Sequence, residues 1–180
     1  MRAIIVKQPG GVDQLAIGEV PTPLPGKGEL LVRVRAAALN RADLLQREGK
    51  YPPPPGSSEI LGLDVAGAVE SAGGDCRRFQ PGDRVFGLLP GGGYAEYAVI
   101  PEAMAMPVPE GFTFEQAAAV PEVFLTAFQT LFWIGRLEAG ERVLIHSGGS
   151  GVGTAAIQLA VEAGAAVATT RTLPQYRGKF

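Results

Sequence analysis

Val143-Leu-Ile-His-Ser-Gly-Gly-Ser-Gly-Val-Gly-Thr-Ala-Ala-Ile157 is the stretch that decides the fold of the second part of this chain. Its first three residues are apolar and typical of a short strand, and the residues after the glycines favour a helix. Gly151-x-Gly153-x-x-Ala156 fits the dinucleotide-binding fingerprint, in which glycines permit a tight turn and a close approach of the backbone to a pyrophosphate. The stretch therefore predicts a strand, a nucleotide loop and a helix whose free N–H groups face an anion.

The sequence around this loop predicts a single β–α–β unit. We expect strands over about 142–146 and 165–170, a helix over about 152–163, and a helix end at Gly164. The fingerprint also calls for an acidic residue about 20 positions after its first glycine if NAD is bound. Arg171 lies there instead, which favours NADPH because a guanidinium pairs well with a 2′-phosphate. The alternative is that Arg171 is a solvated charge at the end of a strand.

The part of the chain before this unit is predicted to be β structure with many turns. Strand composition is found over 2–6, 30–36, 65–71, 84–88 and 94–99, with a short helix over 40–48. Many short strands with frequent turns favour a small barrel or a curled sheet. Thr113-Phe-Glu-Gln116 is a capping-box pattern, and a helical run over 122–134 follows Pro121. The change from strands to helices at Thr113 predicts that a second part of the chain begins there.

Composition and charge exclude several classes of partner. The 180 residues are 46% apolar and carry a net charge of −2, which gives no reason to expect nucleic acid or an anionic membrane. No segment approaches 18 consecutive apolar residues, so no membrane span is expected. One cysteine excludes an internal disulfide, and a cytoplasmic location is the default. Zinc needs three or four ligands, and one Cys and one His cannot supply them.

Several polar residues are candidates for binding, but from spacing alone each has a structural explanation. His146 is expected to make a hydrogen bond at the edge of the loop rather than to act in catalysis. Asn40, Asp43 and Tyr51 flank the short predicted helix. Their spacing favours an N-cap, a carboxylate at the helix start and a packing aromatic. Asn and Tyr side chains can also orient a bound ring or carboxamide.

A set of longer motifs identifies a resemblance that covers residues 1 to about 170. These motifs are Ala38-Leu-Asn-Arg-Ala-Asp43, Gly49-Lys-Tyr-Pro-Pro-Pro-Pro55, Leu61-Gly-Leu-Asp-Val-Ala-Gly67, Pro81-Gly-Asp-Arg-Val85, Gly92-Gly-Tyr-Ala-Glu-Tyr97, Ala117-Ala-Ala-Val-Pro121, Leu125-Thr-Ala127 and the glycine loop. With them the chain resembles the zeta-crystallin-like quinone oxidoreductases, a zinc-independent branch of the medium-chain dehydrogenase/reductase superfamily. Zinc-dependent relatives have a cysteine at the position of Asn40 and a histidine at that of Leu63.

The resemblance implies a fold class and a reaction. The expected fold is mixed β and α/β: a GroES-like, β-rich catalytic domain over 1–122, the start of an incomplete Rossmann domain over 123–172, and a tail over 173–180. The expected reaction is hydride transfer from NADPH to a quinone or an activated enone, without a metal and in the cleft between the domains.

The resemblance also implies site residues. Asn40 and Tyr51 would line the nicotinamide and acceptor site as the catalytic residues. Thr126 would touch the nicotinamide, and Arg171 would lie near the 2′-phosphate. The pyrophosphate would be held by Ser150, Gly151, Val152 and Gly153.

The chain departs from the family because the sheet of about six strands is not completed. We therefore expect a truncated form with impaired activity, in which the β–α–β unit exposes apolar surface through Val143, Leu144, Ile145, Ile157, Leu159 and Val167. Such a form could pair with a second copy or with a full-length relative. The alternative function is a non-catalytic binding or interaction module.

Overall fold

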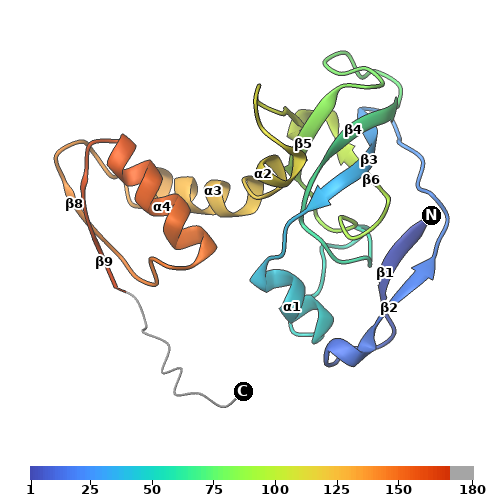
Figure 1. Cartoon of the computed structure of the whole chain (residues 1–180), viewed down its shortest axis with the longest axis horizontal. Coiled ribbons are helices and arrows are strands. Elements are labelled where there is room, and N and C mark those ends of the chain that lie inside the picture. Colours follow the sequence, from blue (N-terminus) through green and yellow to red (C-terminus); the bar gives the residue numbers. More distant parts are fainter. Residues whose placement is uncertain (171–180) are drawn as a thin grey trace. The chain divides into compact units, whose positions relative to one another are not determined.

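The structure is a computed structural model that describes residues 1–170, and it consists of two compact units. Unit 1 comprises Met1–Glu122, and unit 2 begins at Val123. Unit 1 contains most of the strands, whereas unit 2 is built around a β–α–β arrangement (Figure 1). Each unit has its own apolar core and is described by itself.

Unit 1 is dominated by a five-stranded antiparallel sheet with the order β6-β3-β4-β5-β7. Its strands are β3 (Glu29–Ala37), β4 (Asp64–Ala72), β5 (Arg84–Leu88), β6 (Tyr97–Pro101) and β7 (Met106–Pro107). Strands β1 (Arg2–Val6) and β2 (Leu15–Glu19) form a separate antiparallel pair. The remaining elements are the short helices η1 (Val12–Gln14), α1 (Arg41–Arg47), η2 (Glu102–Met104) and α2 (Phe114–Ala118).

Alternating side chains give the central sheet two packed faces. Leu30 and Val32 of β3, Val65 of β4 and Ile100 of β6 form the main core and are almost fully buried. A smaller cluster joins Ala66 and Phe86 with the α2 residues Ala117 and Ala118. Helix α2 therefore covers the sheet on the side that the main core does not use, and β4 lies between the two clusters.

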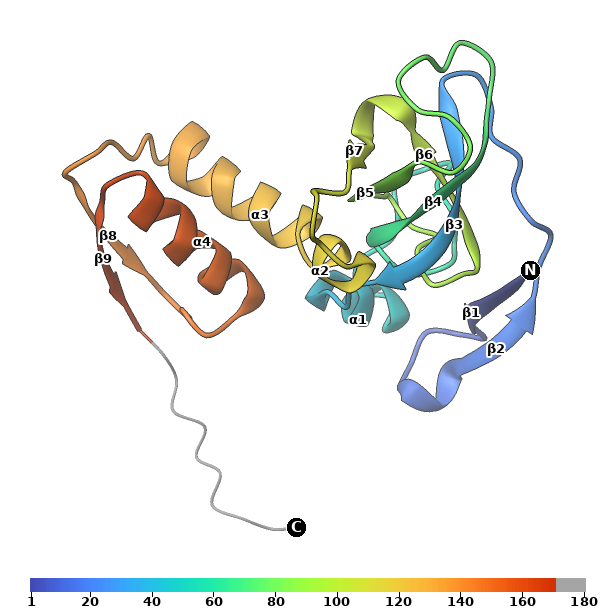
Figure 2. The same cartoon turned by 45° about the horizontal axis from the view of Figure 1, so that its top comes forward.

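Unit 2 places two helices on one side of a parallel strand pair. Its elements are α3 (Pro121–Phe128, which begins in unit 1), the π-helical segment η3 (Gln129–Ile134), β8 (Arg142–Ile145), α4 (Gly151–Glu162) and β9 (Ala166–Thr169). Helices α3 and α4 lie on the same side of β8 and β9 in both views (Figures 1 and 2). Ile145 faces the helices and is buried together with Ala127 and Ala156.

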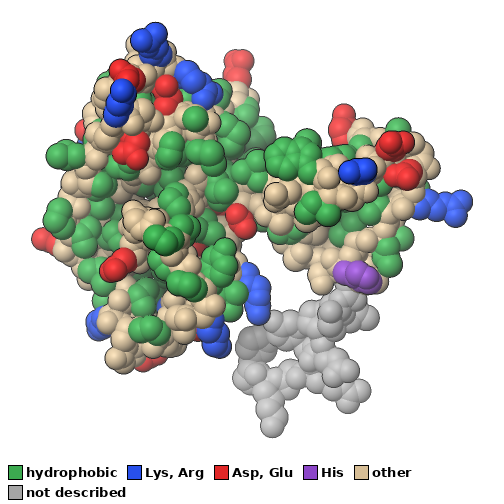
Figure 3. All heavy atoms as spheres, turned by 180° about the vertical axis from the view of Figure 1, so that it is seen from behind, with side chains coloured by type: hydrophobic (Ala, Val, Ile, Leu, Met, Phe, Trp, Pro, Cys, Tyr) green, Lys and Arg blue, Asp and Glu red, His purple; other side chains and the backbone are tan. Residues whose placement is uncertain are grey.

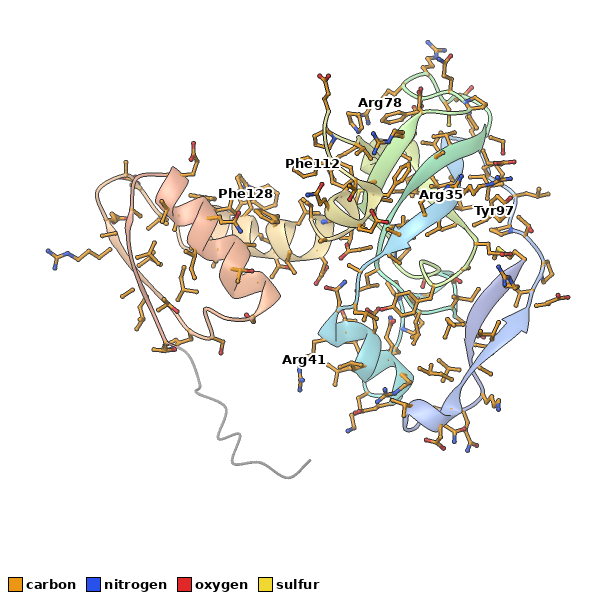
Figure 4. The ribbon with its side chains drawn as sticks, in the orientation of Figure 1. Arg35, Arg41, Arg78, Tyr97, Phe112 and Phe128 are labelled. Atoms are coloured by element: carbon orange, nitrogen blue, oxygen red, sulfur yellow. The ribbon has the colours of Figure 1, made fainter. Side chains whose placement is uncertain are left out.

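Helices α3 and α4 bury some of the apolar side chains of unit 2 and leave others exposed. Leu144 is 57% exposed, whereas its neighbour Ile145 is 8% exposed and Val143 and Val167 are partly buried. The expected exposure is therefore right for Leu144 and wrong for Ile145. The other four side chains expected to be exposed are partly buried: Val143, Ile157, Leu159 and Val167. Trp133 and Ile134 are 69% and 72% exposed. Phe128 projects from α3 among further side chains of that helix (Figure 4).

The predicted fold class is confirmed, while some boundaries differ. The strand expected at 94–99 begins at Tyr97, because Ala95 instead forms an isolated bridge to Ala3 of β1. Strand β2 over Leu15–Glu19 was not predicted. The predicted helix over 122–134 is α3 followed by the wider π-helical turns of η3.

One helical stretch of the described residues, Phe114–Ile134, is long and apolar enough to cross a membrane by length and composition alone. This is weak support for a span, because helices in protein cores pass the same test. Ala117 and Ala118 at its start are buried against β4 and β5, which accounts for their apolar character.

Gly67 provides a test of the packing at the centre of unit 1. A methyl group at this position would overlap the backbone carbonyl oxygen of Arg33 on β3, which cannot move without disturbing the sheet. We expect Gly67→Ala to lower the free energy of unfolding of unit 1 by about 1–3 kcal/mol, measured by urea denaturation. Gly74→Ala is the matched control, because a methyl group there meets nothing within 4 Å. Equal stability of the two variants would contradict this packing.

Candidate functional site

The glycine loop lies between the end of β8 and the start of α4, as the sequence predicts. Ser150 is the N-cap of α4, with extended backbone angles (φ −79°, ψ 164°). Its hydroxyl oxygen accepts a hydrogen bond from the N–H of Gly153 at 3.0 Å. This cap fixes the first turn of the helix and leaves the loop facing along the helix axis, where the helix dipole favours an anion.

The backbone amides of the loop are only partly available to a ligand. Ser150 donates its N–H to the carbonyl of Ser147 at 2.9 Å, and the Gly153 N–H is used by the cap. The N–H groups of Gly151 and Val152 donate to no acceptor within residues 1–170. Of the residues predicted to hold a pyrophosphate, these two therefore offer free backbone donors, and Ser150 offers its hydroxyl.

The glycines of the loop serve different purposes. A methyl group on Gly153 would overlap the backbone of Ser147 and Gly148, so this glycine is required by packing inside unit 2. The prediction that it serves the approach of a pyrophosphate is therefore not needed to explain it. Ser147 itself adopts a positive φ of 57°, a conformation that is uncommon outside glycine. By contrast, a methyl group on Gly149 would meet nothing within 4 Å, so the fold does not require a glycine there.

The other residues of unit 2 that the sequence analysis singled out are Thr126, His146 and Arg171. Thr126 lies in α3, where its carbonyl accepts a hydrogen bond from Thr130 Oγ1 at 2.9 Å. His146 lies at the surface (Figure 3), and its Nδ1 is 3.1 Å from Thr170 Oγ1, which confirms the expected hydrogen bond at the edge of the loop. Arg171 lies outside the described residues. Within residues 1–170, no three Cys, His or acidic residues lie together as a metal site would require.

Asn40 is the N-cap of α1 and forms a capping box with Asp43, in which the Asn40 side chain faces the backbone N–H of Asp43. Its backbone N–H donates to Asp43 Oδ2 at 2.7 Å, and its side-chain Nδ2 donates to Asp64 Oδ2 at 2.8 Å. A single residue therefore joins two carboxylates that come from different elements, α1 and β4. Arg41, the next residue, points away from unit 1 (Figure 4).

Asp43 is buried, with 3% of its surface exposed, and it is fully partnered. Besides the N–H of Asn40, it accepts hydrogen bonds from the Tyr94 hydroxyl at 2.7 Å and from the N–H of Gly62 at 3.3 Å. Burial, followed by the adjacent Asp43 carboxylate, raises the pKa of the Tyr94 hydroxyl. Tyr94 therefore stays protonated and acts as a donor to Asp43.

Asp64 is even more deeply buried, with 1% of its surface exposed. Its second oxygen, Oδ1, accepts a hydrogen bond from the N–H of Glu122 in the first turn of α3 at 3.0 Å. Burial is the main cause that raises the pKa of Asp64 from 3.8 to about 6, and the charges of Glu122 and Asp43 add to it. The hydrogen bonds from Asn40 and Glu122 act in the opposite direction.

Tyr51 is 51% exposed and lies in the loop that follows α1, so it is not the packing aromatic that its spacing favoured. Leu39 and Tyr94, which flank the acid network, also line an open, mainly apolar groove of about 850 Å³. This groove is lined by residues of the β1–β2 pair, by Val34 and Ala37 of β3, and by Gly93–Glu96, which precede β6. Asn40 and Tyr51 belong to unit 1, whereas Thr126 and the glycine loop belong to unit 2.

Sequence reasoning missed the roles of Asp64 and Tyr94. A signal for Asp64 was present, because it is an acid inside the otherwise apolar run Leu61-Gly-Leu-Asp-Val-Ala-Gly67. An acid in such a run is buried and must be partnered. Its partners could not be found from spacing, because they lie 24 and 58 residues away along the chain.

Comparison with known proteins gives a family context for unit 1 and unit 2. Residues 26–110 match the family model of the alcohol dehydrogenase GroES-like domain. The mouse protein named synaptic vesicle membrane protein VAT-1 homolog-like is 37% identical over 159 residues, covering 88% of this chain and 38% of that protein. The chain thus spans well under half the length of this curated relative.

Solved structures show the same likeness. A quinone oxidoreductase from Coxiella burnetii has a TM-score of 0.87 at 35% identity, covering 96% of this chain and 56% of that one. A mycobacterial protein solved as a complex with NADPH has a TM-score of 0.87 at 34% identity, covering 97% and 54%. The enoyl reductase CurK has a TM-score of 0.89 at 30% identity, covering 97% and 55%.

The raised pKa of Asp64 predicts how the stability of unit 1 depends on pH. Because the folded state binds this proton more tightly than the unfolded state, the stabilisation is complete below the unfolded pKa of 3.8 and is lost as pH rises to about 6. The loss is about 3 kcal/mol, from about 1.4 kcal/mol per pKa unit. Urea unfolding of wild type and Asp64→Asn between pH 4 and pH 7 measures it. The variant should lack this component, and identical pH profiles for the two proteins would contradict the assignment.

Proposed function

We propose that this chain, a member of the medium-chain dehydrogenase/reductase superfamily, is the NADPH-binding and acceptor-binding part of a quinone or enone reductase that works without a metal. The observation that carries the proposal is the pair of free backbone N–H groups at Gly151 and Val152, at the start of a helix that directly follows a strand. This is the arrangement that binds a pyrophosphate in dinucleotide-binding folds. The NADPH complex and the reductases among the similar structures support it.

The glycine loop fits the proposed cofactor. Gly151 and Val152 would donate to the pyrophosphate, and the Ser150 hydroxyl would turn from its cap to add a donor. The open space at Gly149 leaves room for the ligand beside the loop. Thr126 would touch the nicotinamide, and Arg171 would pair with the 2′-phosphate, which distinguishes NADPH from NADH.

Asn40 and Tyr51 would act on the side of the acceptor. Tyr51 is half exposed, so its hydroxyl is accessible to a ligand. Asn40 offers a side-chain amide held in place by Asp64. NADPH, when bound, supplies the hydride, and the protein contributes orientation of the acceptor. The proposal involves no metal, because Leu63 stands where the zinc-dependent relatives have a histidine, and a leucine has no ligand atom.

A cytoplasmic location and self-association belong to the same proposal. Trp133, Ile134 and Leu144 expose apolar surface on unit 2, and a second copy or a full-length relative would cover it. The same exposed surface favours the second candidate function, a non-catalytic interaction module. In that case the chain would associate with a partner and would bind no nucleotide.

The two candidates are separated by one experiment. Purified chain is titrated with NADPH while the fluorescence of the reduced nicotinamide is followed, and NADPH oxidation is then measured with a simple quinone and with a simple enone. The reductase proposal expects saturable binding and turnover of at least one acceptor. The module proposal expects neither, with association detected by sedimentation.

Ser150 allows a sharper test of the pyrophosphate site. Asp and Asn are both good N-caps, so Ser150→Asp and Ser150→Asn should keep the stability of unit 2 within about 0.5 kcal/mol. The added carboxylate would repel a pyrophosphate, so Ser150→Asp should weaken NADPH binding by about tenfold or more relative to Ser150→Asn, with a smaller difference at high salt. Fluorescence titration measures both affinities. Equal NADPH affinity of these two variants would mean that the phosphates bind elsewhere.

A further inference from the structure

Helix α3 and the η3 segment after it carry apolar side chains on both sides, although unit 2 covers only one of them. On the inner side, Ala127 is buried in the core of unit 2. A helix that is apolar all round is normally covered on both sides. The other side is exposed, and we call it the outer face; it is formed by Leu125, Phe128, Gln129 and Trp133.

The wider turns of η3 bring Trp133 to the outer face. In a regular α-helix, residues five positions apart point in directions about 140° different, because each residue turns the helix by about 100°. The turns of η3 are π-helical, and the Trp133 ring lies edge-on to Phe128 with the ring centroids 5.8 Å apart. Phe128 projects from α3 (Figure 4), and its ring centroid is 4.9 Å from that of Phe132. The three rings form one cluster, of which Trp133 is the most exposed.

The two ends of this helical stretch carry opposite charges. Residues 121–136 contain only two charged side chains, Glu122 in the first turn of α3 and Arg136 just after η3. Neither makes an ion pair within residues 1–170. Gln129 lies midway between them in the sequence and is exposed. The stretch therefore has a negative end, a positive end and a polar amide at its centre.

This pattern is complementary to itself. Two copies related by a two-fold axis contact one another through the same surface. If the two stretches run antiparallel, Glu122 of each copy meets Arg136 of the other, whereas parallel stretches would bring like charges together. A helix that lies on an anionic membrane carries Lys and Arg along its polar face, and this stretch has a single cation at its end. The charges therefore favour a second copy over a lipid surface.

We propose that the outer face of α3 and η3 binds the same face of a second copy of this chain, antiparallel and with the two-fold axis beside Gln129. This inference rests on the self-association included in the proposed function and gives it a surface and an orientation. The aromatic cluster supplies the apolar centre, in keeping with the enrichment of aromatic residues in interfaces. The two Gln129 amides pair across the axis, because each can donate and accept a hydrogen bond.

Trp133 reports on this interface directly, because it is the only tryptophan of the chain. Its emission maximum is measured over a range of protein concentrations, together with the mass of the particles by sedimentation. Emission should start near that of an exposed indole and shift to shorter wavelength as the dimer forms. A chain that stays monomeric would overturn the inference, and so would a dimer that forms without a shift, because its interface would lie elsewhere.

Exchanging the charges tests the antiparallel orientation. Glu122→Lys and Arg136→Glu each place like charges at both ends of the pair, so each variant alone should dimerise about tenfold more weakly than the wild type at low salt. An equimolar mixture of the two variants should regain the wild-type affinity. In the mixed pair, the introduced lysine meets the introduced glutamate, and the native Arg136 meets the native Glu122. A mixture as weak as either variant alone would overturn the antiparallel orientation.

Gln129→Glu tests the position of the two-fold axis. The change places two carboxylates opposite one another and should weaken the dimer by about tenfold. Gln158→Glu is the matched control, because it makes the same change at an exposed position of α4 and should leave the dimer unchanged. Far-ultraviolet circular dichroism checks that both variants are folded. Equal dimerisation of the two folded variants would contradict an axis beside Gln129.

Vesicles test the other occupant of the outer face. Vesicles of phosphatidylcholine, with and without phosphatidylserine, are added to the wild type at a concentration where sedimentation shows only monomer. The emission of Trp133 should not change. A shift to shorter wavelength on addition of vesicles would show that a lipid surface covers the outer face, and it would overturn the inference.

The NADPH titration separates this inference from the reductase proposal. A chain that dimerises with the shift of Trp133 emission but binds no NADPH would keep the interface and remove the proposed reductase. A chain that binds NADPH and stays monomeric at every concentration would keep the reductase and remove the interface.

Discussion

The carboxylate of Asp64 is the interaction on which the architecture of the candidate site depends. It is the first residue of β4, it is almost fully buried, and its two oxygens accept hydrogen bonds from the Asn40 side chain and the Glu122 backbone. These donors belong to the starts of α1 and α3. Because a buried carboxylate that loses a hydrogen-bond donor costs about 1–3 kcal/mol or more, the helix starts and the strand are fixed together.

The second buried acid, Asp43, completes this arrangement through the same residue. Asn40 donates its backbone N–H to Asp43 and one side-chain N–H to Asp64, so it links the two buried carboxylates. The Tyr94 hydroxyl also donates a hydrogen bond to Asp43. The two buried carboxylates are therefore held in one network that joins α1, β4 and the segment before β6.

The sequence predicts the parts of this structure that local patterns determine. The β–α–β unit around the glycine loop, the helix after Asn40 and four of the strands follow from periodicity and from turn residues. Strand β2 could not be found in this way, because Leu15-Ala-Ile-Gly-Glu19 is short and half exposed. The partners of Asp64 lie on elements that only folding brings together. The sequence therefore predicts that Asp64 is buried, but not which residues it binds. The predicted exposure of Ile145 failed because sequence periodicity does not show that α3 and α4 cover the same face.

The glycine loop shows how a sequence motif can combine requirements of the fold with requirements of a ligand. Gly153 is required by the backbone of Ser147 and Gly148, and its N–H is bound to the cap. A glycine at 153 would therefore be kept in a protein of this fold that bound nothing. Gly149 has no such requirement, and the free N–H groups of Gly151 and Val152 have no partner within residues 1–170. In this chain, the support for a bound anion comes from the free N–H groups of Gly151 and Val152 and not from the spacing of the fingerprint glycines.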